Sequence, residues 1–125
     1  MGKRQMKVVI FGSRTIEDIE HVRQAVSESG IKPKITEIVS GLAAGADTLA
    51  LEYARENGFA VKEFPAHWKE LGRKAGSLRN IEMSKYADFG VAVWDGRSRG
   101  TAHMISLMEG RCHVFVVPPP AEGNK

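Results

Sequence analysis

Short apolar runs alternate along the chain with longer stretches in which apolar residues recur every three or four positions. Runs of the first kind are typical of buried strands, and stretches of the second kind are typical of amphipathic helices. The pattern predicts strands at residues 6–11, 35–39, 60–64, 89–94 and 113–117. It predicts helices between them, at residues 16–29, 47–57, 77–86 and 101–109.

Strands that alternate with helices favour a parallel sheet with right-handed crossovers and helices on both faces. The chain has 125 residues, the size of one ordinary domain. We therefore predict an α/β fold, a Rossmann-like doubly wound parallel sheet of about five strands in a single domain. The domain is expected to span residues 1–120, followed by a C-terminal tail at residues 121–125.

The composition, 42% hydrophobic and 26% charged residues, is that of an ordinary globular protein. No apolar run approaches the roughly 20 residues that span a membrane. The single cysteine, Cys112, cannot form an internal disulfide, which fits a reducing compartment. CxxC and HExxH metal motifs are absent. We expect a cytoplasmic protein without a membrane partner or a bound metal.

The net charge of +3 permits an anionic partner. Six of the basic residues cluster in two short segments, namely Lys69, Arg73, Lys74 and Arg79, and then Arg97 and Arg99. A solvated positive face explains the same clustering without a ligand.

Four unusual loops follow the first four predicted strands. They are 12–14, which is Gly-Ser-Arg, the small-residue run 40–47, the long basic segment 65–80, and the glycine-rich and cationic turn 95–101. Ligands of open α/β sheets bind outside the carboxyl ends of the strands, and these loops are expected to meet at that edge. The sequence therefore predicts a ligand site there.

Several residues of these loops suit a phosphorylated ligand. Gly12 permits close approach of the backbone, Ser13 can donate to an oxyanion, and the following helix start supplies unpaired N–H groups. The triplet is also consistent with a simple tight turn, and it is neither GxGxxG nor a Walker A sequence, which argues against a dehydrogenase or an ATPase. Asp47 is expected either to cap a helix or to bind a ribose hydroxyl.

Arg79 is predicted in the first turns of a helix, where the helix dipole disfavours a cation, so a compensating anion is expected nearby. Trp68 is suited either to stack on a base or to fold onto the core.

Four segments, in this order, resemble the YspA-like, cpYpsA-related branch of the SLOG superfamily. They are FGSR at 11–14, SGLAAGAD at 40–47, AGSLRN at 75–80 and WDGRSRGT at 94–101. The resemblance implies a Rossmann-like fold that binds nucleotides or their derivatives, and a homodimer, because several members are dimers. The superfamily includes phosphoribohydrolases, a DNA-processing protein that acts on single strands, and sensors of NAD-derived signals.

A motif of the phosphoribohydrolases is similar to Arg79-Asn80, and their PGGxGTxxE motif is similar to the segment that ends in Gly100-Thr101. The glutamate of that second motif, which is implied to assist N-glycosidic cleavage, is replaced by Met104. The residues left as candidates for catalysis are Arg79, Asp47, Glu82, Asp95 and His103.

The leading hypothesis is a sensor or recognition domain for a nucleotide derivative, with no other cofactor required. Its expected ligand-binding residues are Gly12, Ser13, Arg14, Ser40, Gly41, Gly45, Asp47, Arg79, Asn80, Asp95, Gly96, Ser98, Arg99, Gly100 and Thr101. A nucleotide N-glycosidase of the phosphoribohydrolase kind is the second hypothesis. Binding of single-stranded nucleic acid is the third.

Overall fold

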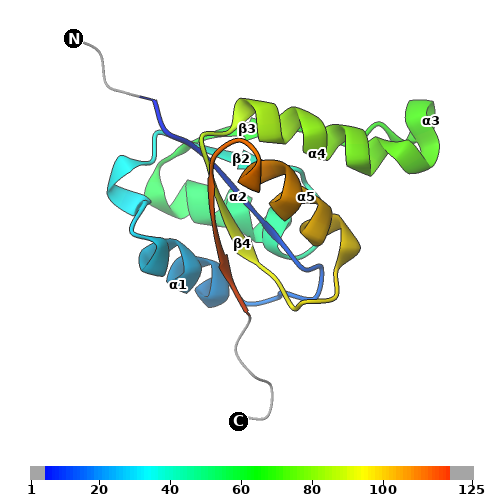
Figure 1. Cartoon of the computed structure of the whole chain (residues 1–125). Coiled ribbons are helices and arrows are strands. Elements are labelled where there is room, and N and C mark those ends of the chain that lie inside the picture. Colours follow the sequence, from blue (N-terminus) through cyan, green and yellow to red (C-terminus); the bar gives the residue numbers. More distant parts are fainter. Residues whose placement is uncertain (1–4, 119–125) are drawn as a thin grey trace.

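The computed structural model describes residues 5–118 and contains one parallel sheet of five strands in the order β3-β2-β1-β4-β5 (Figure 1). The strands are β1 (Lys7–Gly12), β2 (Glu37–Ser40), β3 (Ala60–Glu63), β4 (Phe89–Val93) and β5 (His113–Val117). Every neighbouring pair runs parallel. The predicted α/β, doubly wound sheet is therefore confirmed.

Two helices cover each face of this sheet (Figure 1). One pair is α1 (Ile19–Ser29) and α2 (Ala46–Asn57), and the other is α4 (Ala75–Tyr86) and α5 (Arg99–Glu109). The shorter elements are α3 (Trp68–Leu71), η1 (Lys32–Lys34) and η2 (Gly72–Lys74). In Figure 1, α3 lies at the end of α4 that points away from the rest of the molecule.

The central strand β1 divides the apolar core into two halves because side chains alternate across a strand. Val8 and Ile10 pack with α1 and α2, whereas Val9 and Phe11 pack with α4 and α5. The chain moves from β1 to β2 on one side and returns to β4 on the other. The strand order therefore reverses beside the carboxyl end of β1, which is the place where such sheets bind ligands.

The helix that follows β2 begins differently from one of our expectations. Gly45, not Asp47, occupies the N-cap position of α2, and no side chain caps this helix end. The Gly45 backbone has φ 82° and ψ −131°, a conformation that is almost confined to glycine. Because this turn starts the helix at Ala46, Asp47 lies inside the first turn, and the capping role considered for it is wrong.

Two other helices begin a few residues away from the predicted start. Asp18 caps α1 by accepting a hydrogen bond from the Glu20 N–H at 2.9 Å, so this helix begins at Ile19. The last helix begins at Arg99 because Ser98 occupies its N-cap position. The tail predicted at residues 121–125, and the outermost parts of the predicted 1–120 domain, lie outside the described residues. Within residues 5–118, no helix has the length and apolarity needed to cross a membrane.

Replacing Gly45 with alanine should destabilise the fold strongly. A Cβ at this position would lie 2.3 Å from the Ser13 carbonyl oxygen, and the backbone would have to keep its positive φ. Gly58→Ala is the matched control, because Gly58 also has positive φ (73°) but its Cβ would meet nothing within 4 Å. We expect the control to lose about 1 kcal/mol of unfolding free energy and Gly45→Ala to lose clearly more. Urea unfolding measures both, and equal losses would contradict the steric argument.

Candidate functional site

Ser13 joins three loops at the carboxyl edge of the sheet. Its N–H donates to the Val93 carbonyl at 2.9 Å, and its carbonyl accepts from the Ala46 N–H at 3.4 Å. Its hydroxyl accepts from the Asp95 N–H at 2.9 Å. The loops that follow β1, β2 and β4 are therefore held together through one buried residue.

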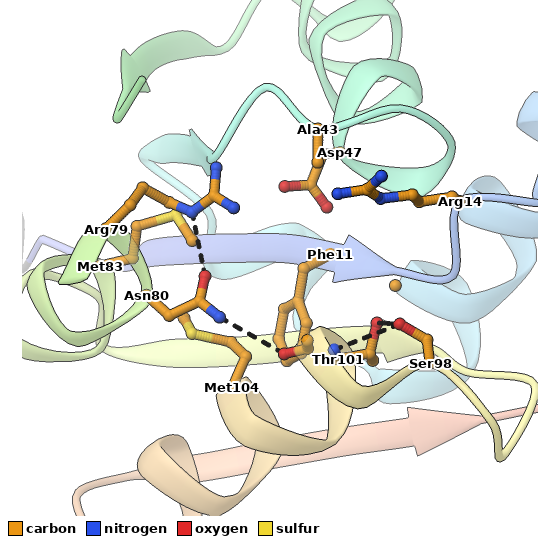
Figure 2. Close-up of a pocket in the computed structure, with 12 residues that line it drawn as sticks. Phe11, Arg14, Ala43, Asp47, Arg79, Asn80, Met83, Ser98, Thr101 and Met104 are labelled. Carbon is orange, nitrogen blue, oxygen red and sulfur yellow. Dashed lines mark hydrogen bonds between the residues drawn. The ribbon is translucent and has the colours of Figure 1, made fainter. Parts of the chain in front are cut away.

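A cleft opens at this junction and encloses about 410 Å³ of empty space, including the part open to solvent. Figure 2 shows side chains from β1, α2, α4 and α5 around it. The lining residues are Phe11, Gly12, Arg14, Ala43, Asp47, Arg79, Asn80, Met83, Ser98, Gly100, Thr101 and Met104. The cleft thus lies at the predicted switch point of the sheet.

Arg79 is held in the wall of the cleft by two hydrogen bonds. Its Nε donates to Asn80 Oδ1 at 3.0 Å, and its Nη1 donates to the Gly41 carbonyl. The pKa of Arg79 is lowered, first because burial disfavours its charge, while the Asp47 carboxylate acts in the opposite direction and Arg14 lowers it further. Asn80, 7% exposed, also donates from Nδ2 to the Gly100 carbonyl at 3.3 Å and so connects Arg79 to the start of α5 (Figure 2).

Asp47 is the buried carboxyl of the site, with 5% of its surface exposed. Figure 2 shows it between Arg79 and Arg14. Burial raises its pKa to about 6, although Arg79 and the backbone N–H groups of Ala43, Gly12 and Gly41 all lower it. Near neutral pH, both the protonated and the ionised form of this carboxyl group are therefore populated.

The absence of a side chain at Gly41 makes room for the two charged groups. A Cβ there would lie 2.9 Å from both Arg79 Nη1 and Asp47 Oδ2. The small residues of the 40–47 loop therefore have a direct structural use, since they let a guanidinium and a carboxyl group approach the backbone.

The first turn of α5 forms the opposite wall. Ser98 Oγ accepts from the Thr101 N–H at 3.3 Å, and the Ser98 carbonyl accepts from the Ala102 N–H at 3.1 Å. The N–H groups of Arg99 and Gly100 have no partner within residues 5–118. Unpaired donors at a helix start, where the dipole is positive, attract anions.

Comparison with known proteins identifies the family of the chain. A family model described as the YspA, cpYpsA-related SLOG family matches residues 6–71. The Gene 61 protein of Mycobacterium phage D29 is 41% identical over 104 residues, which cover 78% of this chain and 83% of the phage protein. The chain belongs to the YspA, cpYpsA-related SLOG family.

A solved structure extends the comparison of the fold. The X-ray structure of DNA processing protein A (DprA) from Streptococcus pneumoniae superposes with a TM-score of 0.72 at 21% identity. The match covers 96% of this SLOG chain and 52% of that chain, so the SLOG chain spans about half the length of its structural neighbour.

The structure brings eight of the predicted ligand-binding residues to the cleft of this SLOG protein: Gly12, Arg14, Asp47, Arg79, Asn80, Ser98, Gly100 and Thr101. Gly41 lines a hollow beside it. Ser13, Ser40 and Gly45 shape the backbone of the loops instead; the Ser40 hydroxyl donates to the Asp47 carbonyl at 2.7 Å. Gly96 and Arg99 are exposed and lie outside the set of lining residues.

The candidates for catalysis separate in the same way. Asp47 and Arg79 line the cleft, whereas Glu82 is exposed and does not. Asp95 accepts from the N–H groups of Arg97 (2.8 Å) and Ser98 (3.1 Å), and these bonds lower its pKa. His103 lies outside the lining set, with its Nδ1 3.4 Å from Asn80 Nδ2. Within residues 5–118, no cluster of His, Cys, Asp and Glu could hold a metal ion.

Four lining residues were not among the predicted ligand contacts: Phe11, Ala43, Met83 and Met104. Phe11 and Met83 belong to regular apolar patterns that also predict the core. Phe11 is part of the FGSR segment and Met83 follows Arg79-Asn80 in the phosphoribohydrolase-like motif, but neither was assigned to the ligand. Ala43 lies in the small-residue run, which did indicate close approach. Met104 was recognised only as the replacement of a glutamate, and it lies in the cleft with 1% of its surface exposed.

Asp47→Asn should become more stable relative to the parent as the pH rises. The folded pKa, about 6, lies above the ordinary value of 3.8. The contribution of this group to stability is therefore full below about pH 4 and is lost as the pH rises through about 6. Because asparagine does not ionise, the difference in unfolding free energy between variant and parent should grow by up to about 3 kcal/mol between pH 4 and pH 7.5.

Urea unfolding in phosphate-free buffer at several pH values measures this difference. Asp95→Asn is the control with the opposite sign. Because the pKa of Asp95 is lowered, its ionised carboxylate stabilises the fold, and the unfolding free energy of the Asp95→Asn variant should fall relative to the parent as the pH rises. A difference between Asp47→Asn and the parent that does not change with pH would contradict the raised pKa.

Proposed function

We propose that this protein binds a nucleotide or nucleotide derivative, such as a nucleoside phosphate or an NAD-like molecule, through its phosphate at the cleft. The observation that supports this most directly is the imbalance of charge at one edge of the sheet. Arg14 and Arg79 face a single buried carboxyl, Asp47, whose own pKa is raised (Figure 2). Asp47 balances at most one of the two positive charges, so a bound anion that contacts the arginines would offset the other.

The start of α5 supplies the second half of the phosphate contact. Gly100 lines the cleft and has a free N–H group at the positive end of the helix dipole, and the Thr101 hydroxyl lies 2.9 Å from Ser98 Oγ in the same wall. Charge-assisted bonds from arginine are about twice as strong as neutral hydrogen bonds. Arg79 and the start of α5 would therefore both contribute to the affinity for a phosphate. The backbone N–H groups of α5 would also fix the orientation of the phosphate.

Family membership supports the same proposal, because the SLOG resemblance implies recognition of nucleotides or their derivatives. The structural neighbour, named for DNA processing, supports a nucleotide or nucleic-acid related role more broadly. A sensor or recognition domain needs only the cleft as described. A homodimer and a cytoplasmic location belong to the same proposal and rest on the family resemblance and the sequence alone.

Asp47 supports a second candidate function, hydrolysis of the N-glycosidic bond. In that reaction, water adds to C1′ of the ribose, the bond from C1′ to the base breaks, and the departing base takes up a proton. A carboxyl group with a pKa of about 6 is suited to deliver such a proton near neutral pH. Met104, which lies in the same cleft, can neither give nor take one.

Arg79→Ala should weaken binding of nucleoside monophosphates about 10- to 100-fold, since it removes a charge-assisted contact from a partly buried site. Arg73→Ala removes the same charge from an exposed position outside the cleft and should leave this affinity unchanged. Isothermal titration with adenosine and uridine monophosphates and with NAD compares the two variants. An Arg79→Ala protein that binds as tightly as the parent would refute the phosphate site.

A single-stranded oligonucleotide in the same titration separates the third hypothesis. Binding that falls steeply with salt and weakens in Arg73→Ala would indicate a nucleic-acid surface along α3 and η2. Mononucleotide binding that needs Arg79 alone favours the proposed cleft.

The hydrolase candidate predicts release of free base from a nucleoside monophosphate or NAD, detected by chromatography. Release should be lost in Asp47→Asn and kept in Glu82→Gln, because only the first carboxyl lies in the cleft. If the parent releases no base from any of these compounds, the enzyme candidate is refuted and the binding function stands.

A further inference from the structure

A second hollow adjoins the cleft and has about 690 Å³ of empty space, including the part open to solvent. Arg14, Ala43 and Arg79 line both hollows. The remaining lining residues of the second one include Leu42, Pro65 and Trp68. Arg14 and Arg79 therefore border both hollows, and a ligand longer than a phosphate would reach both.

Trp68 presents its indole ring to this second hollow. The residue is 53% exposed, so it does not fold onto the core, which was one of the two roles considered for it. A Cβ added at Gly76 would lie 3.3 Å from Trp68 Cη2 and 3.8 Å from Arg79 Nη2. The indole and the guanidinium thus both lie close to Gly76, a residue without a side chain in the first turn of α4.

Leu42 contributes a second apolar surface from the loop after β2. It is the only non-glycine residue with positive φ, 64°, among residues 5–118, and 36% of its surface is exposed. Such a backbone costs free energy in a residue with a side chain, and strain of this kind concentrates at ligand sites. The fold therefore keeps an unfavourable backbone at a residue that lines the hollow.

We propose that this second hollow is the base subsite of the nucleotide site. The planar base would stack on the Trp68 indole near Leu42 and Pro65, the ribose would pass Arg14 and Ala43, and the phosphate would lie at Arg79 and the start of α5. The assignment rests on the proposed function, and it adds the class of group that the ligand must carry. Stacking is available to every base, so it selects for a base and discriminates poorly between bases.

Paired ligands test this subsite. Affinities for adenosine, guanosine, cytidine and uridine monophosphates are compared with the affinity for ribose 5-phosphate, which has the phosphate and no base. The parent should bind at least one nucleotide more tightly than ribose 5-phosphate. Trp68→Ala should lose about 5- to 100-fold of nucleotide affinity, the range expected for one stacked base, with unchanged affinity for ribose 5-phosphate.

Leu71→Ala is the matched control, because Leu71 is 42% exposed on the same helix and lines neither hollow. It should bind every ligand as the parent does. Trp68→Phe, which keeps an aromatic face, should recover most of the lost affinity. Arg79→Ala should weaken nucleotides and ribose 5-phosphate alike, which separates the phosphate contact from the base contact.

The outcomes divide the two proposals. If nucleotides and ribose 5-phosphate bind the parent equally, or Trp68→Ala binds nucleotides as the parent does, the base subsite is overturned and the phosphate site stands. If the parent binds neither kind of ligand, the proposed function and the subsite fall together. Binding of oligonucleotides without mononucleotides would overturn the subsite as assigned here.

Discussion

The close approach of three backbone loops at Ser13 is the constraint on which the site depends. Gly12 lies so near the neighbouring strand that a Cβ would be 2.1 Å from the Val93 carbonyl oxygen, and Gly45 approaches Ser13 almost as closely. Hydrogen bonds also link Ser13 to the end of β4 and to the loops after β2 and β4. The cleft is therefore built from backbone that cannot separate without breaking the carboxyl edge of the sheet, and its side chains are presented by rigid elements.

This frame holds charged groups that are disfavoured by burial and, for Arg14 and Arg79, by repulsion between like charges. Arg79 loses solvation and feels the like charge of Arg14, and Asp47 is buried deeply enough for its pKa to rise. Burying such groups opposes folding, and partial pairing offsets only part of that cost. Packing in the two halves of the apolar core and at Gly12 and Gly45 offsets the remaining cost. Binding of an anion at the arginines would lower that cost further.

The sequence predicts the fold well because its signals are local and repeated. Apolar runs place all five strands, and glycine stops such as Gly30 and Gly58 close the first two long helices. The edge of the site follows from the same logic. Contacts between distant residues do not follow from such local signals. Nothing near Ser13 in the sequence reveals that its hydroxyl accepts a hydrogen bond from the Asp95 N–H, and nothing near Asp47 reveals that the Gly45 turn places it inside the first turn of α2. Trp68 shows the same limit, since its exposure depends on where α3 docks against α4.

The floor of the cleft bears on the choice between recognition and hydrolysis. Phe11, Met83 and Met104 are almost fully buried there and offer a phenyl ring and two thioethers, none of which accepts a proton. Asp47 is the one carboxyl group among the residues that line the cleft, and burial raises its pKa to about 6. Hydrolysis would therefore have to use this one carboxyl group both to protonate the leaving base and to orient water. Arg79 opposes the first role because its charge favours the ionised form of Asp47. Recognition of a phosphate needs no proton transfer, and it would use Arg14, Arg79 and the N–H groups at the start of α5, with Asp47 favouring it most in the protonated form.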